Sequence, residues 1–351
     1  GRSAEGAGAP GRRGAGARRA GTAAMFRCVT YNVHGGIGAD GAYDLERIAG
    51  VIRRSGCDIV CLQEVEVNLV PRRQRKWSCR HADDQPKLLA ESTGLCHSGF
   101  SGPLCAYLKE DAPAGEEVLI KDTEGKSRYG NAILSRLAVL EWRELAFEIT
   151  EEPGGGESAS DELTAAGGDL IYMDRVPQPR GALAALVDAS PGEGKGGSGG
   201  LVWVVCTHLS HKLCSEEQRS QARQLLAWAS GLAGEGGPAV LLCGDMNSPP
   251  LVPWSSYRAI TTDHSSAARW HDLWWGSGPW FFQSTFPSSF ASPLCGVRID
   301  HMFALESRAH AAIKCKSMRV LASSEDAFAS DHCAALADLE VQLRGAPRLA
   351  A

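Results

Sequence analysis

The chain has 351 residues, of which 44% are hydrophobic and 22% charged, enough apolar content for one large α/β domain or two average ones. Its formal net charge of -5 gives no general attraction to nucleic acid, although a local basic patch stays compatible with that balance. No apolar run reaches the length of about 18 residues that a membrane-spanning helix needs, which argues against a transmembrane segment.

Residues 1–24 are rich in Gly, Ala and Arg and contain no apolar stretch. We expect this segment to be a disordered leader; an organelle transit peptide or a remnant of expression are the alternatives. The regular pattern begins at Met25, and we expect one domain over 25–345 followed by a short tail at 346–351.

Apolar runs and helical periodicity alternate in the first half of the domain. In the helix expected at 43–56, Leu45, Ile48 and Ile52 form the apolar face. The other elements expected in this half are strands at 25–33, 57–65, 130–135 and 139–147 and a helix at 84–94.

The same order of elements returns in the second half. A Ser215–Gln218 capping box marks the start of a strong helix at 215–232. The strands expected here are 181–189, 201–209, 239–245, 297–304, 314–322 and 333–341. Because a strand–helix–strand unit followed by further strands occurs twice, we predict two similar layers that pack together.

Three Gly- and acid-rich stretches interrupt this pattern, at 109–128, 150–169 and 190–200. None of them can bury a core of its own, and the strand pattern resumes after each. We therefore predict loop insertions within a single domain.

The twelve cysteines favour reduced thiols over a disulfide scaffold. Cys28, Cys61, Cys206 and Cys243 lie inside apolar strand runs, where free cysteine behaves as a small hydrophobic residue. This usage indicates an intracellular protein, cytoplasmic or nuclear unless the leader directs it to an organelle.

The segment GIGADG at 36–41 matches a dinucleotide-binding glycine loop, and Glu64 lies at a suitable distance for a ribose contact. Such a loop opens directly into its helix, whereas here three residues intervene and Asp44 is placed as an N-cap. We therefore reject a dinucleotide site.

Polar residues at or near strand ends form the strongest pattern. Each has a plain structural explanation when it is taken alone, such as a turn or a cap, but the set as a whole does not. Asp, Glu and Asn oxygens suit Mg²⁺, and carboxylates and histidines can activate water and stabilise charge at a phosphate. The set therefore points to metal-assisted hydrolysis of a phosphate ester; its members are Asn32, Glu64, His208, Asp245, Asn247, Asp300, Asp331 and His332.

In chain order, TYNVHGG, LQEV, YGNAILS, PRGAL, THL, GDMN, RIDH and SDH resemble the motifs of the endonuclease/exonuclease/phosphatase superfamily, to which pancreatic deoxyribonuclease belongs. The resemblance spans about 25–342 and is strongest to small, poorly characterised members. It implies a four-layer α/β sandwich: two packed mixed β-sheets flanked by helices.

The resemblance also implies roles for these residues. Asn32 and Glu64 are similar to the metal-binding pair, with Asp331 as a third ligand, and the ion would be Mg²⁺ or Mn²⁺. His208 resembles the histidine that contacts the scissile phosphate. Asp245 and Asn247 resemble the groups that orient the attacking water and hold phosphate oxygens, and Asp300 and His332 resemble the Asp–His pair. The identity of the general base stays open.

Four further residues and two segments have more than one interpretation. Tyr129 and Arg180 stand where some relatives contact substrate, but either residue could be structural. His34 and His301 favour structural roles. The basic run 71–76 could grip a phosphate backbone or be a solvated loop. The aromatic region 270–290 could stack on bases, meet a lipid interface or pack in the core, and we favour core packing.

The sequence thus predicts a Mg²⁺-dependent hydrolase of phosphodiesters, most similar to a nuclease. A lipid or inositol phosphatase or phosphodiesterase resembling a sphingomyelinase is the alternative, and a catalytically silent binding module is the third possibility. The expected partner is a phosphate-ester substrate, with nucleic acid plausible, and we expect a monomer.

Overall fold

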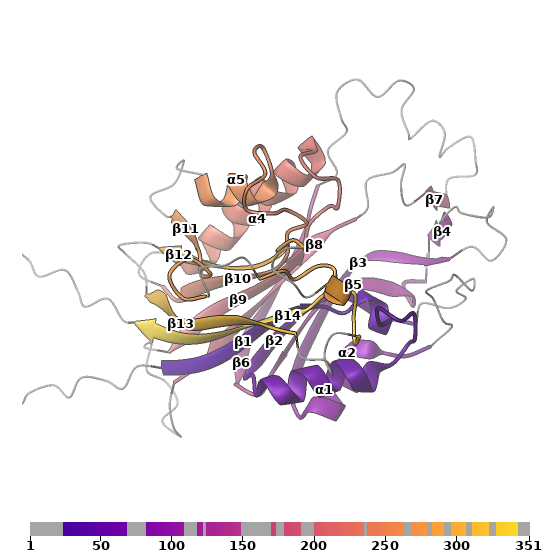
Figure 1. Cartoon of the computed structure of the whole chain (residues 1–351), viewed down its shortest axis with the longest axis horizontal. Coiled ribbons are helices and arrows are strands. Elements are labelled where there is room, and N and C mark those ends of the chain that lie inside the picture. Colours follow the sequence, from indigo (N-terminus) through magenta and orange to yellow (C-terminus); the bar gives the residue numbers. More distant parts are fainter. Residues whose placement is uncertain are drawn as a thin grey trace, which may run out of the picture.

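The computed structural model describes residues 24–68, 82–108, 118–121, 124–148, 170–172, 179–190, 200–234, 237–262, 269–278, 283–290, 296–306, 311–322 and 328–342. Two β-sheets face each other in the middle of the molecule and helices cover both outer faces (Figure 1). The leader and the tail expected from the sequence lie outside the described residues, except for Ala24.

An eight-stranded sheet contains most of the N-terminal half and the last two strands. Its order is β13-β14-β1-β2-β5-β3-β4-β7. The strands are β1 (Ala24–Asn32), β2 (Ile59–Val67), β3 (His97–Leu108), β4 (Val118–Lys121), β5 (Arg128–Ser135), β7 (Leu170–Tyr172), β13 (Ala312–Leu321) and β14 (Ala334–Gln342).

A six-stranded sheet contains the remaining strands, in the order β11-β12-β10-β9-β8-β6. They are β6 (Val139–Ala146), β8 (Gly181–Asp188), β9 (Leu201–His208), β10 (Ala239–Asp245), β11 (Arg269–Asp272) and β12 (Asp300–Glu306). Each sheet has one parallel pair, β1 with β2 and β9 with β10, and its other pairs are antiparallel, so both sheets are mixed.

A crossover helix joins each parallel pair, as parallel pairing requires. Helix α1 (Leu45–Ser55) connects β1 to β2, and α4 (Glu216–Ala233) connects β9 to β10. Helices α2 (Gln85–Thr93) and α5 (Ser256–Thr262) and the 3-10 turns η1 (His34–Gly36) and η2 (Ser288–Phe290) complete the described helical elements. The strand–helix–strand unit expected twice from the sequence is therefore present in both sheets.

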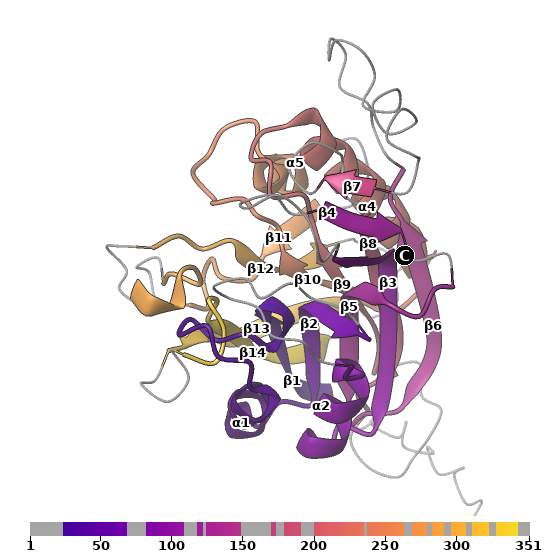
Figure 2. The ribbon, with the colours of Figure 1, turned by 90° about the vertical axis from the view of Figure 1, so that its right-hand side faces the viewer.

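Three apolar layers hold these elements together. Between the sheets lie residues such as Ile133, Leu183 and Leu241. One outer layer packs α1 and α2 against the eight-stranded sheet, and another packs α4 and α5 against the six-stranded sheet. Figure 2 shows the two helix pairs on opposite sides of the paired sheets. The expected four-layer sandwich is confirmed.

The helix starts follow the capping signals of the sequence. The Asp44 carboxylate accepts hydrogen bonds from the N–H groups of Glu46 and Arg47 at the start of α1. The Ser215 hydroxyl accepts from Gln218 N at 3.0 Å at the start of α4. These caps satisfy backbone donors that a helix leaves unpaired at its first turn.

The structure also contains elements that the sequence pattern did not predict. Strand β3 carries Gly99 and Gly102, whose missing side chains leave room for Trp142 and Phe100. Helix α5 is too short to show a helical period. The expectation of a loop at 109–128 is wrong in part, because β4 lies inside it and pairs with β3. The stretch 150–169 and most of 190–200 lie outside the described residues.

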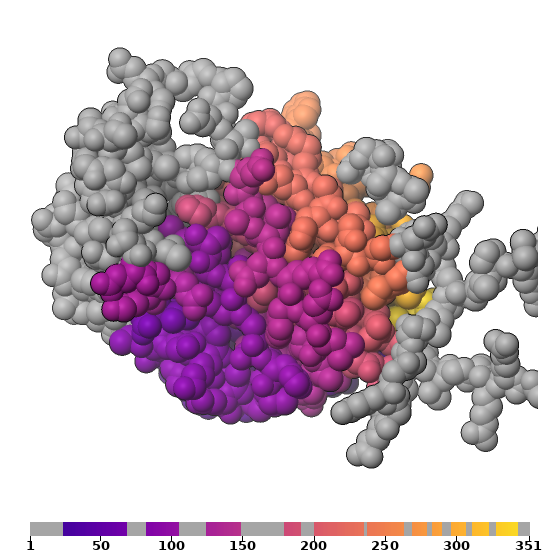
Figure 3. Space-filling view, turned by 180° about the vertical axis from the view of Figure 1, so that it is seen from behind, coloured from indigo at the N-terminus to yellow at the C-terminus, as the bar shows by residue number. Residues whose placement is uncertain are grey.

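Figure 3 shows the molecule from behind, where the purple residues of the N-terminal half and the orange residues of the C-terminal half lie side by side on one surface.

The longest described helix, α4, has 18 residues. Within the described ranges, neither α4 nor any other helix combines the length and apolar composition of a membrane span.

Candidate active site

Polar side chains from both sheets meet at the ends of the two parallel strand pairs. Asn32 is the last residue of β1, His208 the last of β9 and Asp245 the last of β10. Asp300 begins β12 and pairs in register with Asp245. Because parallel strands end at one edge of a sheet, and the two sheets face each other, these ends converge.

Asn32 joins the two sheets at the centre of this site. Its Nδ2 donates to Glu64 Oε1 on β2 and to Asp245 Oδ2 on β10, each at 3.0 Å. Its Oδ1 accepts from His34 N at 3.0 Å. The amide therefore fixes the spacing between two carboxylates that belong to different sheets.

His208 lies between a guanidinium and the carboxylates. Its Nδ1 is 2.7 Å from Arg180 Nη1, and its Nε2 is 3.6 Å from Asp245 Oδ2 and 3.9 Å from Glu64 Oε1. A guanidinium only donates, so Nδ1 must accept and the ring proton sits on Nε2. Burial and then the Arg180 charge hold the pKa of His208 well below its usual value, so the ring is neutral.

Asn247 completes the group around His208. Its backbone N donates to Asp245 Oδ1 at 2.8 Å, and its Nδ2 donates to Leu209 O at 3.1 Å. The same Nδ2 lies 3.0 Å from His208 Nε2. Since Nε2 carries a proton, two N–H groups stand side by side.

Asp300 and His332 form a buried pair. His332 Nδ1 is 2.9 Å from Asp300 Oδ2, and Nε2 is 3.8 Å from Asp245 Oδ2. Burial lowers the pKa of His332, but the charge and hydrogen bond of Asp300 outweigh burial and raise it to about 10. Burial and the charge of Asp300 raise the pKa of Asp245 to about 7.

Glu64, Asp331 and His34 form the more open side of the site. The side chains of Glu64, Asp331 and His34 are 21%, 32% and 35% exposed. Burial raises the pKa of Glu64, but the electrostatic effect of the neighbouring histidines, including charged His332, and the hydrogen bond from Asn32 outweigh it and lower the pKa. Asp331 lies 3.7 Å from His34 Nδ1, and burial and the charge of Glu64 raise its pKa. Glu64 and Asp331 together, two carboxylates on the open side of the site, are a suitable donor set for a divalent cation.

Asp245, Asp300 and His332 bring potential ligand atoms within 4.8 Å of one another. These three side chains are almost fully buried, and Asp300 and His332 are hydrogen-bonded to each other. Glu64 and Asp331 reach solvent and leave room for water and substrate, so we favour them as the cation side.

The backbone is strained where it presents the site residues. His34, Glu64 and Asn247 have φ values of 47°, 58° and 49°, which residues other than glycine rarely adopt. Such strain persists only where the surrounding structure imposes it, and it collects at functional sites. At Gly244 a Cβ would lie 2.0 Å from Thr207 O, so only glycine lets β10 approach β9 closely enough to set Asp245 beside His208.

The structure also shows where the two candidate substrate contacts, Arg180 and Tyr129, and the two histidines expected to be structural lie. Arg180 is buried and contacts His208, whereas half-buried Tyr129 lies on β5 opposite Glu66. His34 lies on the open side of the site. His301 is buried, and its Nδ1 is 3.1 Å from Arg298 Nη1 while its Nε2 is 2.9 Å from Ser248 O, which fits a structural role.

In the aromatic region 270–290, Trp270 and Trp274 are buried while Trp275 is 57% exposed. Core packing therefore describes the first two of these residues. The run 71–76 lies outside the described residues.

Several supporting residues were missed at the sequence level. Ser330 Oγ donates to Asn32 O at 2.8 Å, and Thr285 Oγ1 accepts from Asp300 N at 3.2 Å. Asn131 Nδ2 donates to the carbonyl of Gly181, beside Arg180, at 3.1 Å. Asn131 lies in the YGNAILS motif and Ser330 in the SDH motif, so the sequence offered a way to find both. Thr285 lies in none of the motifs.

Comparison with known proteins agrees with this fold. The sequence model of the Endonuclease/Exonuclease/phosphatase family matches residues 29–332. A search of curated protein sequences finds no match.

Three solved structures illustrate the likeness. An endonuclease/exonuclease/phosphatase from Beutenbergia cavernae DSM 12333 is 26% identical, with a TM-score of 0.62 over 91% of this chain and 72% of that one. One from Bacteroides vulgatus is 18% identical, with a TM-score of 0.56 over 91% and 99%. A mannosyl-6-phosphatase from Bacteroides thetaiotaomicron is 16% identical, with a TM-score of 0.54 over 90% and 99%. Since the family match covers most of the chain, this protein belongs to the Endonuclease/Exonuclease/phosphatase family.

Proposed function

We propose that the protein is a Mg²⁺-dependent phosphoesterase that hydrolyses a phosphodiester by attack of water. The observation that carries the proposal is the convergence, at one edge of the paired sheets, of carboxylates and hydrogen-bond donors from both sheets. Asn32 links Glu64 to Asp245, and His208 lies within 4 Å of both carboxylates.

The donor pair of His208 and Asn247 suits a phosphate oxygen. Their nitrogens, 3.0 Å apart, both carry hydrogens, and Arg180 fixes the His208 tautomer. Two adjacent donors repel each other, and a phosphate oxygen in front of the pair would accept from both and offset that repulsion. Donors positioned in advance for developing negative charge stabilise a phosphoryl transition state.

Asp245 suits the activation of water. Its Oδ1 is held by Asn247 N and its Oδ2 by Asn32 Nδ2, so the carboxylate has one orientation. His332 Nε2 lies 3.8 Å from Oδ2, close enough to share a water or a phosphate oxygen. In this assignment Asp245 accepts the proton of the attacking water, and Asp300 orients His332.

The open carboxylates Glu64 and Asp331 would hold the cation. Bound Mg²⁺ would supply positive charge that neutralises the phosphate and polarises its P–O bonds. Asn32 Oδ1 accepts one hydrogen bond, from His34 N, and its second lone pair would add a ligand to the cation.

A substrate panel with and without EDTA tests the proposal. We expect turnover of a generic phosphodiester with Mg²⁺ or Mn²⁺ and none after chelation. Asp245→Asn and Glu64→Gln should each lower kcat by about 10² to 10⁴-fold. The matched control Asp338→Asn changes a carboxylate on β14 that pairs with Arg27 and should keep full activity. Unchanged turnover in Asp245→Asn would overturn the site assignment, and no turnover on any substrate would overturn the enzyme assignment.

Within this chemistry we favour a nuclease over a lipid or inositol phosphatase. Nucleic-acid hydrolysis should require a polymer and fall steeply with salt, because phosphate-backbone contacts release counterions. Hydrolysis of a small phosphate monoester, or of lipid vesicles with a shallow salt dependence, would favour the alternative. The fold does not choose between them, since a sugar phosphatase shares it.

A further inference from the structure

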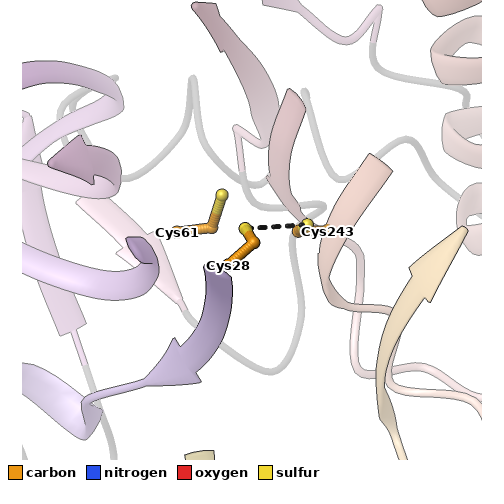
Figure 4. Close-up of side chains that lie close together, drawn as sticks. All are labelled: Cys28, Cys61 and Cys243. Atoms are coloured by element: carbon orange, nitrogen blue, oxygen red, sulfur yellow. Dashed lines mark hydrogen bonds between the residues drawn. The ribbon is translucent and has the colours of Figure 1, made fainter. Parts of the chain in front are cut away.

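Four cysteines meet in the apolar layer between the two sheets. Cys28 lies on β1, Cys61 on β2, Cys206 on β9 and Cys243 on β10, and all four have no exposed surface. Figure 4 shows Cys28 and Cys61 from one sheet facing Cys243 from the other. One buried cysteine is ordinarily a small hydrophobic residue, but here four neighbouring strands present one at the same place.

These cysteines lie directly beneath the candidate active site. Cys206 and Cys243 pair in register and precede His208 and Asp245 by two residues, so each shares a strand face with its site residue. On β1, Cys28 precedes Asn32 by four residues on the same face. At about 3.3 Å per residue, the thiols lie roughly 7 to 13 Å below the site.

The sulfur positions suit a metal ion. Cys28 Sγ and Cys243 Sγ are 3.9 Å apart, and the sulfurs of Cys28, Cys61 and Cys243 all lie within 4.8 Å of one another. A tetrahedral zinc–thiolate site has Zn–S distances of about 2.3 Å, which places its sulfurs about 3.8 Å apart. Small movements of one side chain would close the remaining difference.

A polar side chain also reaches this group of cysteines. The buried amide of Gln63 donates to Cys206 Sγ at 3.2 Å, and its position between the sheets is unusual for a polar side chain. Soft ions bind thiolate sulfur, so this site needs neither a carboxylate nor a water molecule as a ligand.

We propose that Cys28, Cys61 and Cys243, with the neighbouring Cys206 as a fourth ligand, bind one thiophilic d¹⁰ ion, Zn²⁺ or Cu⁺. The thiols of Cys28, Cys61 and Cys243 release their protons to solvent as the ion binds, while Cys206 coordinates as a neutral thiol. The three thiolates and Zn²⁺ then carry a net charge of only -1, whereas three unpaired thiolates would be prohibitive in this layer. The ion joins β1 and β2 of one sheet to β10 of the other. These strands carry Asn32, Glu64 and Asp245, so the ion holds together the parts of the candidate site that come from different sheets.

Metal content of the full chain tests the proposal. The protein is produced in medium supplemented with Zn²⁺ or, separately, with copper under reducing conditions, and then dialysed against EDTA, which strips Mg²⁺. We expect about one equivalent of zinc or copper to remain, and the two media identify which ion the site prefers. X-ray absorption of the wild-type protein should show sulfur as the only nearest neighbour of the ion.

Alanine variants locate the site. Cys61→Ala and Cys243→Ala should each lose the metal and unfold at a lower temperature than the loaded wild type. The control Cys57→Ala removes an equally buried thiol from the outer layer beside α1 and should retain the metal. If Cys61→Ala and Cys243→Ala do not fold, the wild-type X-ray absorption decides. A folded wild-type protein without metal from both media, or a spectrum of oxygen and nitrogen ligands, would overturn the proposal.

Discussion

Arg180 acts at the scale of a single hydrogen bond. Its Nη1 lies 2.7 Å from His208 Nδ1 and forces the ring proton onto Nε2, where a phosphate would be. Arg180→Ala frees the tautomer and removes a buried cation, so kcat should fall about 10² to 10³-fold while KM changes little. Arg180→Lys should recover part of the loss, because lysine donates without the planar fork.

Steady-state kinetics on the diester identified by the panel measure this effect. Arg143→Ala, which removes a guanidinium that is 48% exposed on β6, is the control and should behave as wild type. A loss confined to KM, with kcat intact, would instead make Arg180 a simple binding residue.

Gly244 is required by the close approach of two backbones. Its φ is 154°, and a Cβ there would lie 2.0 Å from Thr207 O. Gly244→Ala should cost about 1–3 kcal/mol of unfolding free energy through overpacking and should displace Asp245, so that activity falls as well. Urea denaturation with an activity assay measures both.

The control for Gly244→Ala is a glycine that has free space. Gly231 lies in α4 and a Cβ there would meet nothing within 4 Å. Gly231→Ala should stabilise the protein by up to about 1 kcal/mol, because alanine is the better helix former. If both changes had the same sign, the steric argument for Gly244 would be wrong.

At the residue scale, the sequence predicted which polar residues would gather but not how they bond. Strand ends and spacing are enough to bring Asn32, Glu64 and Asp245 to one edge. Asn32 presents Nδ2 to the carboxylates because its Oδ1 accepts a hydrogen bond from His34 N, and the η1 turn positions that N–H group. Such a contact is set by three-dimensional packing, and no local pattern carries it.

At the scale of elements, predictability followed the apolar pattern. Buried strands such as β9 and β10 read as continuous apolar runs and were predicted. Strand β3 was missed because glycines replace its side chains where Trp142 and Phe100 pack. Strand β11 has only four residues, which is too few for a period to show.

β11 is tied to the segment just before β12 by a buried ion pair that the sequence did not reveal. Arg298 donates to both oxygens of Asp272, at 3.2 and 2.8 Å, and both side chains are 1% exposed. Burial raises the pKa of Asp272, but the Arg298 charge and hydrogen bonds outweigh it and lower the pKa below the usual value. The pair therefore contributes stability that is fully present above the unfolded-state pKa of about 3.9 and is lost as pH falls through the folded-state pKa.

The corresponding variant is Asp272→Asn. At pH 7 it should cost about 3–5 kcal/mol, because Arg298 is left buried without its partner. As pH falls below about 4 the carboxyl protonates first in the unfolded chain and at lower pH in the folded protein, so the difference in unfolding free energy between wild type and variant should shrink. Urea denaturation from pH 7 to pH 3 measures it, with Glu144→Gln, at an exposed position of β6, as a control that leaves the unfolding free energy nearly unchanged. A difference that stays constant down to pH 3 would mean that the ion pair is not its source.

At the scale of the whole molecule, the site exists only where two sheets meet. The repeated strand–helix–strand order predicted both layers, and their central parallel pairs carry Asn32, Glu64, His208 and Asp245. The sequence could not give the distances across the interface, because they depend on how the side chains between the sheets fill the space. The cysteines beneath the site show the same limit, since nothing local in the sequence joins Cys28 to Cys243.

This arrangement predicts how stability is distributed through the molecule. All residues of β10 and nearly all of β9 are buried, whereas edge strand β6 is largely exposed and β13 is mostly half-buried. Amides of β9 and β10 should therefore exchange with solvent only on global unfolding, and those of β6 and β13 by smaller local openings. Hydrogen exchange of the full chain, followed by mass spectrometry, measures this order. Equal protection of β6 and β10 would contradict it. The high protection expected for β10 matters for catalysis. A local opening of β10 would separate Asp245 from Asn32 and His208, and the proposed reaction needs these groups held in one geometry.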